Sequence, residues 1–406
     1  MKRKVILFIS AVFLLSACGN DDEKSKEQSN ENEQQQQQQQ DSGSVKDIAT
    51  DKNVSGDNYR TILPFKESKA RGVLQENMAN SYNGEDFESG LLDLSKEVFP
   101  TEDYLYQDGQ YLDKDTINAY LGPKYTKDEI DDMDEDERKE KKANENLGLN
   151  PSHNGETDPE KIAENSPAYL SNILEQDFYN SGDTKGEKIK GMTIGLAMNS
   201  TYYYQKEKDG ETYSKKLDDK EIKKQGKKMS EEILTRLREN KELKDIPIHF
   251  AVYKQSGENS IIPGEFIAGT TVEGDKTRIN EWKDIQQKTA LLPSGEAAEL
   301  DESLNSDFKQ FNDNLQTYFN NFTQAVGTVK FDNKEAKQLS VDVPIDYYGK
   351  AETIGITQYV TEQAKKYFDD IDEYEIHIKD GNNPKALISK TKEDKEPQVH
   401  IYKNNN

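Results

Sequence analysis

Alternating apolar and polar residues, followed by apolar residues at helical spacing, mark one folding unit at 186–275. Apolar side chains occupy alternate positions over 190–204, which predicts a strand. One apolar stripe over 219–238 predicts an amphipathic helix, because its members recur every three or four residues. Two further apolar runs, 246–253 and 264–272, predict a pair of strands. The unit therefore reads as strand, helix, strand, strand.

The same order of elements recurs at 327–406. Alternation over 338–348 predicts a strand, and the three-and-four spacing over 356–371 predicts a helix. Strands are predicted again at 374–378 and 385–392. We therefore predict an α+β fold with two tandem mixed β-α-β-β repeats in the C-terminal half.

The remainder of the folded chain has a weaker pattern. Residues 276–326 predict a connecting helical segment, because one apolar side recurs through it: Leu304, Phe308, Phe311, Leu315, Phe319, Phe322 and Val326. Residues 59–185 contain only short helical patterns, near 71–80 and 85–96. We expect them to form a less regular N-terminal segment packed on the repeats.

The first residues have the layout of a lipoprotein signal peptide. Lys2–Lys4 are basic, Val5–Leu15 are mostly apolar, and Ser16-Ala17-Cys18 follows. The apolar run is much shorter than the about 20 residues that span a membrane. We predict that a diacylglyceryl transferase modifies Cys18 and that lipoprotein signal peptidase cuts between Ala17 and Cys18. The lipid on Cys18 would then hold the protein at the outer face of the cell membrane.

Residues 18–58 are predicted to be the lipidated cysteine and a disordered tether. Asn, Asp, Glu, Lys, Ser and Gln dominate this segment, which includes an unbroken glutamine run at 34–40. Such a composition cannot bury enough apolar surface to offset the entropy of ordering. As a flexible coil, its part from Gly19 to about Val45 would span about 25 to 30 Å.

The composition limits the classes of partner. Hydrophobic residues make up 32% of the 406 residues and charged residues 33%, with a net charge of −24. Removing residues 1–17 takes away three positive charges and no acid, so −24 becomes −27. Nucleic acid would repel such a chain, so we expect no nucleic-acid partner. Cys18 is the only cysteine, and lipidation would leave no thiol for catalysis or metal binding.

No catalytic or cofactor signature is present, so we expect no enzyme, no cofactor and no metal. The acidic run 127–142 begins like a calcium loop, but Glu137 replaces the turn glycine and Ala143 the bidentate glutamate. Asp342 and Asp346 are the first candidate carboxylate pair for a glycosidase, which needs about 5 to 5.5 Å between them. Solvated carboxylates on a strand edge are the simpler interpretation.

Two further sets of residues occupy matching positions in the predicted repeats. His249 and His377 each follow an isoleucine in a strand, which favours a duplication over shared chemistry. Tyrosines end the equivalent first strands and are candidates for lining a shared groove for sugar or peptide: Tyr202, Tyr203, Tyr204, Tyr347 and Tyr348. Half-buried strand residues are the alternative interpretation.

Several stretches resemble the CamS family, lipoproteins of Gram-positive bacteria named for the sex pheromone cAM373. These stretches are the residues around Cys18, then 51–61, 77–84 and 352–359, with sequences DKNVSGDNYRT, NMANSYNG and ETIGITQY in the last three. The resemblance covers the chain apart from the glutamine-rich spacer. The family is also described as having two related repeats in its C-terminal half, which is similar to the duplication predicted above.

The resemblance implies that the named activity lies in the signal peptide. Processing in the family releases a heptapeptide that enterococcal recipient cells sense, and here it would be Ala11, Val12, Phe13, Leu14, Leu15, Ser16 and Ala17. The Ser16-Ala17 ending departs from the pheromone pattern. The predicted function is therefore a surface lipoprotein and pheromone precursor. The alternatives are an extracellular binding module for a cell-wall, peptide or host ligand, and a cell-wall hydrolase.

Overall fold

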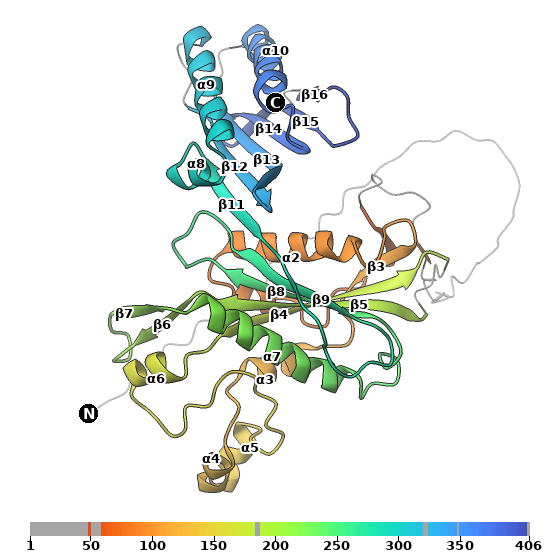
Figure 1. Ribbon diagram of the computed structural model, residues 1–406, viewed down its shortest axis with the longest axis vertical. Helices are drawn as coiled ribbons and strands as arrows, with labels where there is room; N and C mark the ends of the chain where they lie inside the picture. Colours follow the sequence, from red (N-terminus) through yellow and green to blue (C-terminus); the bar gives the residue numbers. More distant parts are fainter. Residues whose placement is uncertain (1–47, 50–57, 183–186, 320–323, 347–348, 404–406) are drawn as a thin grey trace, which may run out of the picture. The chain divides into compact units, whose positions relative to one another are not determined.

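A computed structural model of the chain describes residues 48–49, 58–182, 187–319, 324–346 and 349–403. Residues 45–406 form one compact unit. The fold is α+β, as predicted, with sheets of eight, six and two strands (Figure 1). Among the described residues no helix is long and apolar enough to cross a membrane.

The eight-stranded sheet combines antiparallel pairs with two parallel pairs, β2–β3 and β5–β8. Helices α2 (Ser81–Lys96) and α7 (Asp219–Leu237) cover its opposite faces (Figure 1). In spatial order its strands are β1 (Ile48–Ala49), β2 (Arg60–Leu63), β3 (Tyr104–Asp108), β4 (Leu170–Asn180), β5 (Ile189–Asn199), β8 (Ile248–Gln255), β9 (Glu265–Val272) and β10 (Lys283–Asp284).

Side-chain size along β5 explains why two helices pack on this sheet. Large residues face α7, and small residues alternate with them on the α2 side, because successive strand residues point to opposite faces. Gly195 lies on the α2 side, where an added Cβ would approach Leu91 to 2.7 Å and Phe87 to 2.8 Å. The backbone of β5 thus admits α2 closely, while Met192 and Ile194 fill the core under α7.

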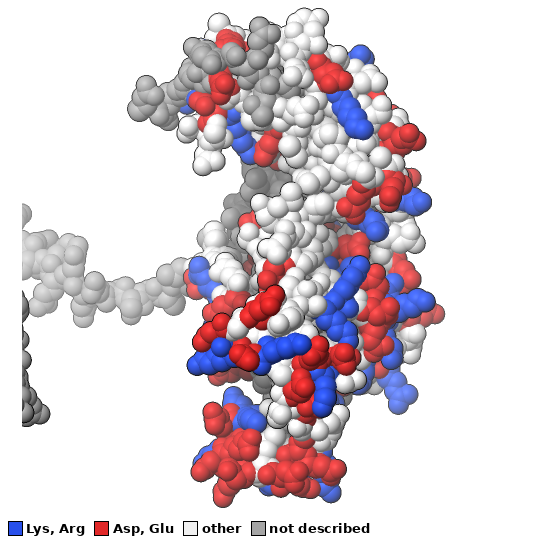
Figure 2. Space-filling view, turned by 90° about the vertical axis from the view of Figure 1, so that its left-hand side faces the viewer, with Lys and Arg blue, Asp and Glu red and all other residues white. Residues whose placement is uncertain are grey.

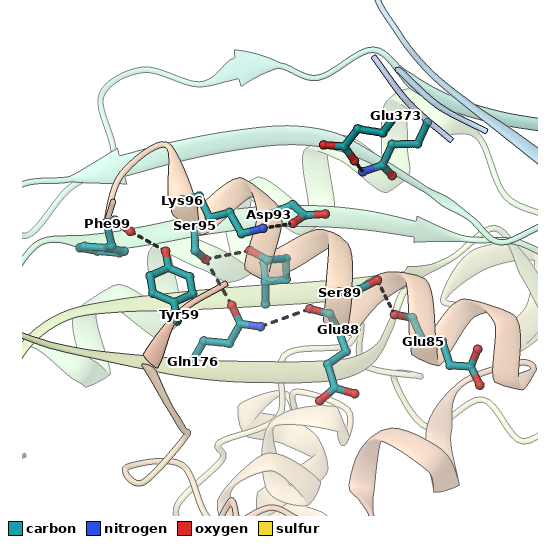
Figure 3. A network of polar contacts seen from close by, with 12 residues as sticks. Tyr59, Glu85, Glu88, Ser89, Asp93, Ser95, Lys96, Phe99, Gln176 and Glu373 are labelled. Carbon is teal, nitrogen blue, oxygen red and sulfur yellow. Dashed lines mark hydrogen bonds and ion pairs between the residues drawn. The ribbon is translucent and has the colours of Figure 1, made fainter. Parts of the chain in front are cut away.

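The contact between α2 and the sheet also contains buried polar groups (Figure 3). The Ser95 hydroxyl oxygen lies 2.8 Å from Thr193 Oγ1 and 3.2 Å from Gln176 Oε1. Gln176 Nε2 donates to the Glu88 carbonyl at 3.2 Å. These bonds pair side chains that burial would otherwise leave without partners.

The six-stranded sheet packs one face against helices α8 (Gly295–Leu300), α9 (Glu302–Tyr318) and α10 (Lys350–Tyr367). Its strands in spatial order are β11 (Gln287–Leu292), β12 (Val326–Asp332), β13 (Glu335–Pro344), β14 (Glu373–Asp380), β15 (Asn383–Lys390) and β16 (Gln398–Ile401). Burial alternates along β13, with Leu339, Val341 and Val343 buried. Its other face therefore carries polar side chains.

The two large sheets share one pairing scheme. β4–β5 is antiparallel, β5–β8 parallel and β8–β9 antiparallel. β12–β13, β13–β14 and β14–β15 repeat that sequence of orientations. The parallel pairs β5–β8 and β13–β14 are each connected through a helix, α7 in the first and α10 in the second.

Two predicted boundaries and one predicted arrangement were wrong. The strand predicted over 190–204 ends at Asn199, and the tyrosines belong to a separate ribbon of β6 (Thr201–Gln205) and β7 (Thr212–Lys216). The central helix ends at Tyr318, and Val326 is a 51% exposed residue of β12. Residues 59–185 supply β2, β3 and β4 to the main sheet instead of an irregular layer.

The other helices are short: α1 (Val73–Asn77), α3 (Lys114–Leu121), α4 (Lys127–Asp132), α5 (Glu135–Glu140) and α6 (Pro159–Asn165). Acidic side chains gather at the lower end of Figure 2, which α4 and α5 form in Figure 1. Within the described ranges, no group of three or more metal-ligating side chains could hold an ion.

Candidate functional site

Polar side chains meet where the parallel strands β5 and β8 end. Gln255 Nε2 donates to Asn199 Oδ1 at 2.6 Å and to the Ser171 hydroxyl oxygen at 3.0 Å. The Ala79 amide donates to Gln255 Oε1 at 2.9 Å. Ligands of open α/β sheets bind outside such carboxyl ends. Here the Gln255 side chain forms its hydrogen bonds with neighbouring segments of the chain, so it stabilises this edge of the sheet.

Two asparagines of the stretch 77–84 hold the loop 256–264 onto the start of α2. Asn83 is fully buried, and its Oδ1 accepts from the amides of Ser256 and Gly264, both at 2.9 Å. Asn80 caps α2 by accepting from the Asn83 amide, and its Nδ2 donates to the Gly257 carbonyl at 3.0 Å. Residues 77–84, one of the stretches that resemble the CamS family, thus attach the loop 256–264 to α2.

The β6–β7 ribbon carries the first set of predicted groove tyrosines. The Tyr202 and Tyr204 rings are stacked 6.3 Å apart, and Tyr204 stacks on Tyr213 at 5.6 Å. Lys206 Nζ lies 4.9 Å from the Tyr213 ring centroid. Tyr203 instead contacts the loop after β8, because its hydroxyl oxygen accepts from the Glu258 amide at 3.1 Å. The ribbon is therefore an aromatic row of half-buried and exposed rings.

Tyr347 and Tyr348 lie outside the described residues, so the shared groove remains a prediction. Cys18 and the Ala11–Ala17 stretch also lie outside them. Each prediction for these positions rests on the sequence and the family alone.

The two candidate carboxylates lie in β13 and just after it, and their surroundings differ. Asp342 is exposed and its Oδ1 forms an ion pair with Lys379 Nζ at 2.6 Å. Asp346 borders a small cavity of about 10 Å³ whose other walls are mostly apolar, among them Phe319 and Ile345. The structure thus favours the interpretation of solvated carboxylates for Asp342.

The two strand histidines occupy different environments. His249 is 8% exposed, and its Nδ1 lies 2.9 Å from the Thr271 hydroxyl oxygen. Burial, with a smaller effect of the Lys283 charge, lowers the pKa of His249 to about 4, so its ring is neutral at pH 7. His377 is half-buried, with Nε2 3.4 Å from the Glu375 carboxylate.

A buried acid pair on β4 escaped the sequence reasoning. The Gln110 amide donates to both Glu175 Oε1 and Asp177 Oδ2 at 2.9 Å, and the Leu112 amide donates to Glu175 Oε2 at 2.6 Å. Burial raises the pKa of both carboxyls, and the Glu175 charge raises that of Asp177 further. Gly109 makes room, since a Cβ there would lie 2.6 Å from Glu175 Cβ. The pair fixes the turn that follows β3.

A cavity of about 810 Å³ lies beside β9. Leu94 and Val98, from the end of α2 and the residues after it, form part of its wall together with Ile285, and His249 and Gly269 line it from the sheet. Its size is within the range of about 300 to 1,000 Å³ that is usual for ligand sites. Sequence periodicity gave no sign of it, because loop 273–282 and residues of six elements, α2, β8, β9, β10, β11 and β12, line it together.

Comparison with known proteins identifies the family. Residues 65–396 match the family described as CamS sex pheromone cAM373 precursor. The chain belongs to the CamS family. None of the curated proteins matches it.

Two solved structures of CamS-type proteins resemble this one. The C-terminal domain of the sex pheromone staph-cAM373 precursor from Staphylococcus aureus is 73% identical, with a TM-score of 0.74, and the match covers 82% of this chain and all of the other. A sex pheromone precursor from Lactobacillus salivarius is 29% identical, with a TM-score of 0.75, and the match covers 88% of this chain and all of the other.

Proposed function

We propose that this CamS protein is a lipid-anchored surface lipoprotein whose cleaved signal peptide is the precursor of a cAM373-like peptide. The observation that carries the proposal is the 73% identity to a chain described as a staph-cAM373 precursor. The lipoprotein layout around Cys18 supports it independently. The folded body carries no catalytic role in this proposal.

The proposed chemistry produces two products from one cleavage. A thioether would join Cys18 to diacylglycerol, and two acyl chains are what stable membrane anchoring requires. Cleavage after Ala17 would release the signal peptide, from which trimming before Ala11 gives the heptapeptide. All seven side chains are uncharged, so the peptide would carry only its terminal ammonium and carboxylate.

The experiment compares cells that express the wild-type chain with cells that express Cys18→Ala. We expect the mass of the Ala11–Ala17 peptide in the supernatant and a lipidated protein in the membrane fraction of the wild type. Cys18→Ala should lose both, because the transferase needs the thiol. A matched exposed substitution in the folded body, Lys208→Ala, should change neither. Absence of the peptide from wild-type supernatants would overturn the pheromone part, and an unlipidated wild-type protein the anchor.

We also propose that the two β-α-β-β units arose by duplication. Their identical pairing scheme supports this, as does the Ile-His pair in the parallel strand of each unit. Ile248 pairs with Met192 and Ile376 with Val341, so each histidine follows an isoleucine of the strand that pairs in parallel with the first strand of its unit. Superposing the two units on these histidines should align three strands and a helix. A best superposition in another register would contradict the proposal.

A second candidate function, a binding module, is favoured by the aromatic row on the β6–β7 ribbon. Exposed and half-exposed tyrosines present apolar rings with a polar hydroxyl, as binding surfaces for sugars and peptides often do. Soluble residues 45–406 can be titrated with purified wall fragments while tyrosine fluorescence is recorded. We expect a change that Tyr204→Ala abolishes. An unchanged spectrum would remove the support for wall binding at the ribbon.

A further inference from the structure

The outer edge of β9 is only partly paired. β10 contributes two residues, Lys283 and Asp284, which pair with Gly269 and Ala268, and the Ile285 amide donates to the Ile267 carbonyl at 3.3 Å. Along an antiparallel strand, every second residue directs its backbone N–H and C=O toward the same neighbouring strand. After Gly269, the next residue of β9 that directs these groups toward the outer edge is therefore Thr271. In the described part of the chain, no strand lies opposite Thr271. Its backbone N–H and C=O are thus available to a further strand.

This open edge borders the 810 Å³ cavity, since Gly269, Thr270, Thr271 and Val272 all line it. Leu94, Val98 and Ile285 add apolar surface. An extended peptide that adds to a sheet edge needs such a combination of free backbone groups and side-chain pockets. The cavity therefore offers both elements of that binding mode.

A buried polar group below this wall lacks a partner. His249 lines the cavity and is 92% buried, and among the described residues no group bonds to its Nε2. Gly269 has no side chain to cover the ring: a Cβ there would lie 3.7 Å from Nε2 and 3.1 Å from Ile285 Cδ1. A buried nitrogen without a hydrogen-bond partner destabilises the fold until a ligand supplies one. A ligand that displaced the Ile285 side chain would reach it.

The charges of the wall favour a particular peptide chemistry. Arg278 and Lys283 line the cavity, and within the described ranges neither forms an ion pair, although the chain has a net charge of −24. Five acidic residues line it as well: Glu97, Glu273, Glu281, Asp284 and Asp332. Acidic side chains on a ligand would meet these carboxylates. A free carboxyl terminus can be bound by the unpaired cations without placing further negative charge along the groove.

We propose that the outer edge of β9 and this cavity bind an extended apolar peptide with a free carboxyl terminus, and that the Ala11–Ala17 product is the occupant. The peptide adds as a strand at Thr271. Its carboxylate pairs with Arg278 and Lys283, and its apolar side chains contact Leu94 and Ile285. The site stands on the geometry above, whereas the choice of occupant rests on the proposed function.

The test uses residues 45–406, which form one compact unit; the corresponding domain of the S. aureus relative has been solved by itself. Synthetic Ala-Val-Phe-Leu-Leu-Ser-Ala is titrated into protein carrying labelled isoleucine δ1 methyl groups. We expect saturable shifts at Ile285 and none at Ile388, which is buried in the other sheet. The same peptide with a C-terminal amide should bind at least about tenfold more weakly, because it lacks the charge that Arg278 recognises.

Two variants separate the site from general stability. Thr271→Pro removes the outward N–H at an edge position that tolerates proline, and it should weaken binding at least about tenfold. Arg278→Glu should weaken binding of the acid and leave binding of the amide unchanged. The matched control is Lys208→Glu, which makes the same charge change as Arg278→Glu but lies on the remote β6–β7 turn. It should bind the peptide as the wild type does.

Three outcomes would overturn the inference: no shift at Ile285, equal affinity for acid and amide, or full binding by a folded Thr271→Pro. Each leaves processing untouched, because release of the peptide is read by mass spectrometry of cells. Loss of the peptide from cells with retained binding of the synthetic peptide would instead refute the proposed function, and with it the choice of occupant, but leave the site.

Discussion

Replacing Asn83 by alanine should destabilise the protein by disconnecting the loop 256–264 from α2. The side chain is fully buried and makes bonds in both directions: Oδ1 accepts from the Ser256 and Gly264 amides, and Nδ2 donates to the Ser256 carbonyl at 3.1 Å. The Gly264 amide also has the Tyr253 hydroxyl oxygen at 2.7 Å. It therefore keeps an acceptor in the variant, whereas the Ser256 amide loses the Asn83 acceptor.

The magnitude follows from this difference. A buried donor left without an acceptor costs about 1 to 3 kcal/mol, and each other lost bond about 0.5 to 1.5 kcal/mol. We expect Asn83→Ala to lower the free energy of unfolding by about 2 to 4 kcal/mol. Urea denaturation of residues 45–406 measures it, and amide exchange at 256–264 should accelerate in the same variant.

The matched control is Asn165→Ala. Asn165 is exposed on α6 and its Nδ2 donates only to the Lys161 carbonyl at 3.0 Å. Surface changes of this kind stay within about 0.5 kcal/mol. If Asn83→Ala cost no more than Asn165→Ala, the loop would not depend on this bracing, and the reasoning would be refuted.

Three further changes test other parts of the fold. Asp177→Asn should become more stable relative to the wild type as the pH rises. The pKa values of Asp177 and Glu175 are raised in the folded protein, so their protonated forms stabilise the fold fully below the pKa values of the unfolded chain. The wild type loses this stabilisation as the pH rises through the pKa values of the folded protein. Urea denaturation at pH 5 and pH 8 measures the difference, and parallel curves would contradict it. Gly195→Ala should cost about 1 to 3 kcal/mol by overpacking against α2, whereas Gly355→Ala, in open space on α10, should gain about 0.5 to 1 kcal/mol; thermal unfolding compares them. The pKa of His249 is lowered to about 4, so stability should fall as pH drops from about 6.5 toward 4, where the unfolded chain takes up the proton first; a ring titrating near 6.5 by NMR would contradict this.

Apolar periodicity was sufficient to predict the elements that bury one continuous face. The helix predicted over 219–238 is α7, and the strand predicted at 374–378 lies inside β14. In both, most of the buried residues are apolar, so the sequence pattern and the burial coincide.

The pattern failed where polar residues are buried. β4 was missed because Glu175, Gln176 and Asp177 interrupt its apolar run, yet all three are buried. Their partners come from residues 88–95 and 110–112, far away in the sequence. No local periodicity reports such pairing. The cavity beside β9 was invisible for the same reason, since its walls come from distant segments.

Different interactions hold the two helices on the eight-stranded sheet. This difference indicates which helix has the more specific position. α7 packs through apolar residues such as Ile222, Met229 and Ile233, which favour burial without dictating one position. α2 adds hydrogen bonds from Ser95 and Asn83 that only one register satisfies. A buried polar network loses more than an apolar contact when it is shifted, because each misplaced group loses its partner. The α2 side thus has the more sharply defined geometry, and both the braced loop 256–264 and the cavity beside β9 lie on elements that α2 contacts.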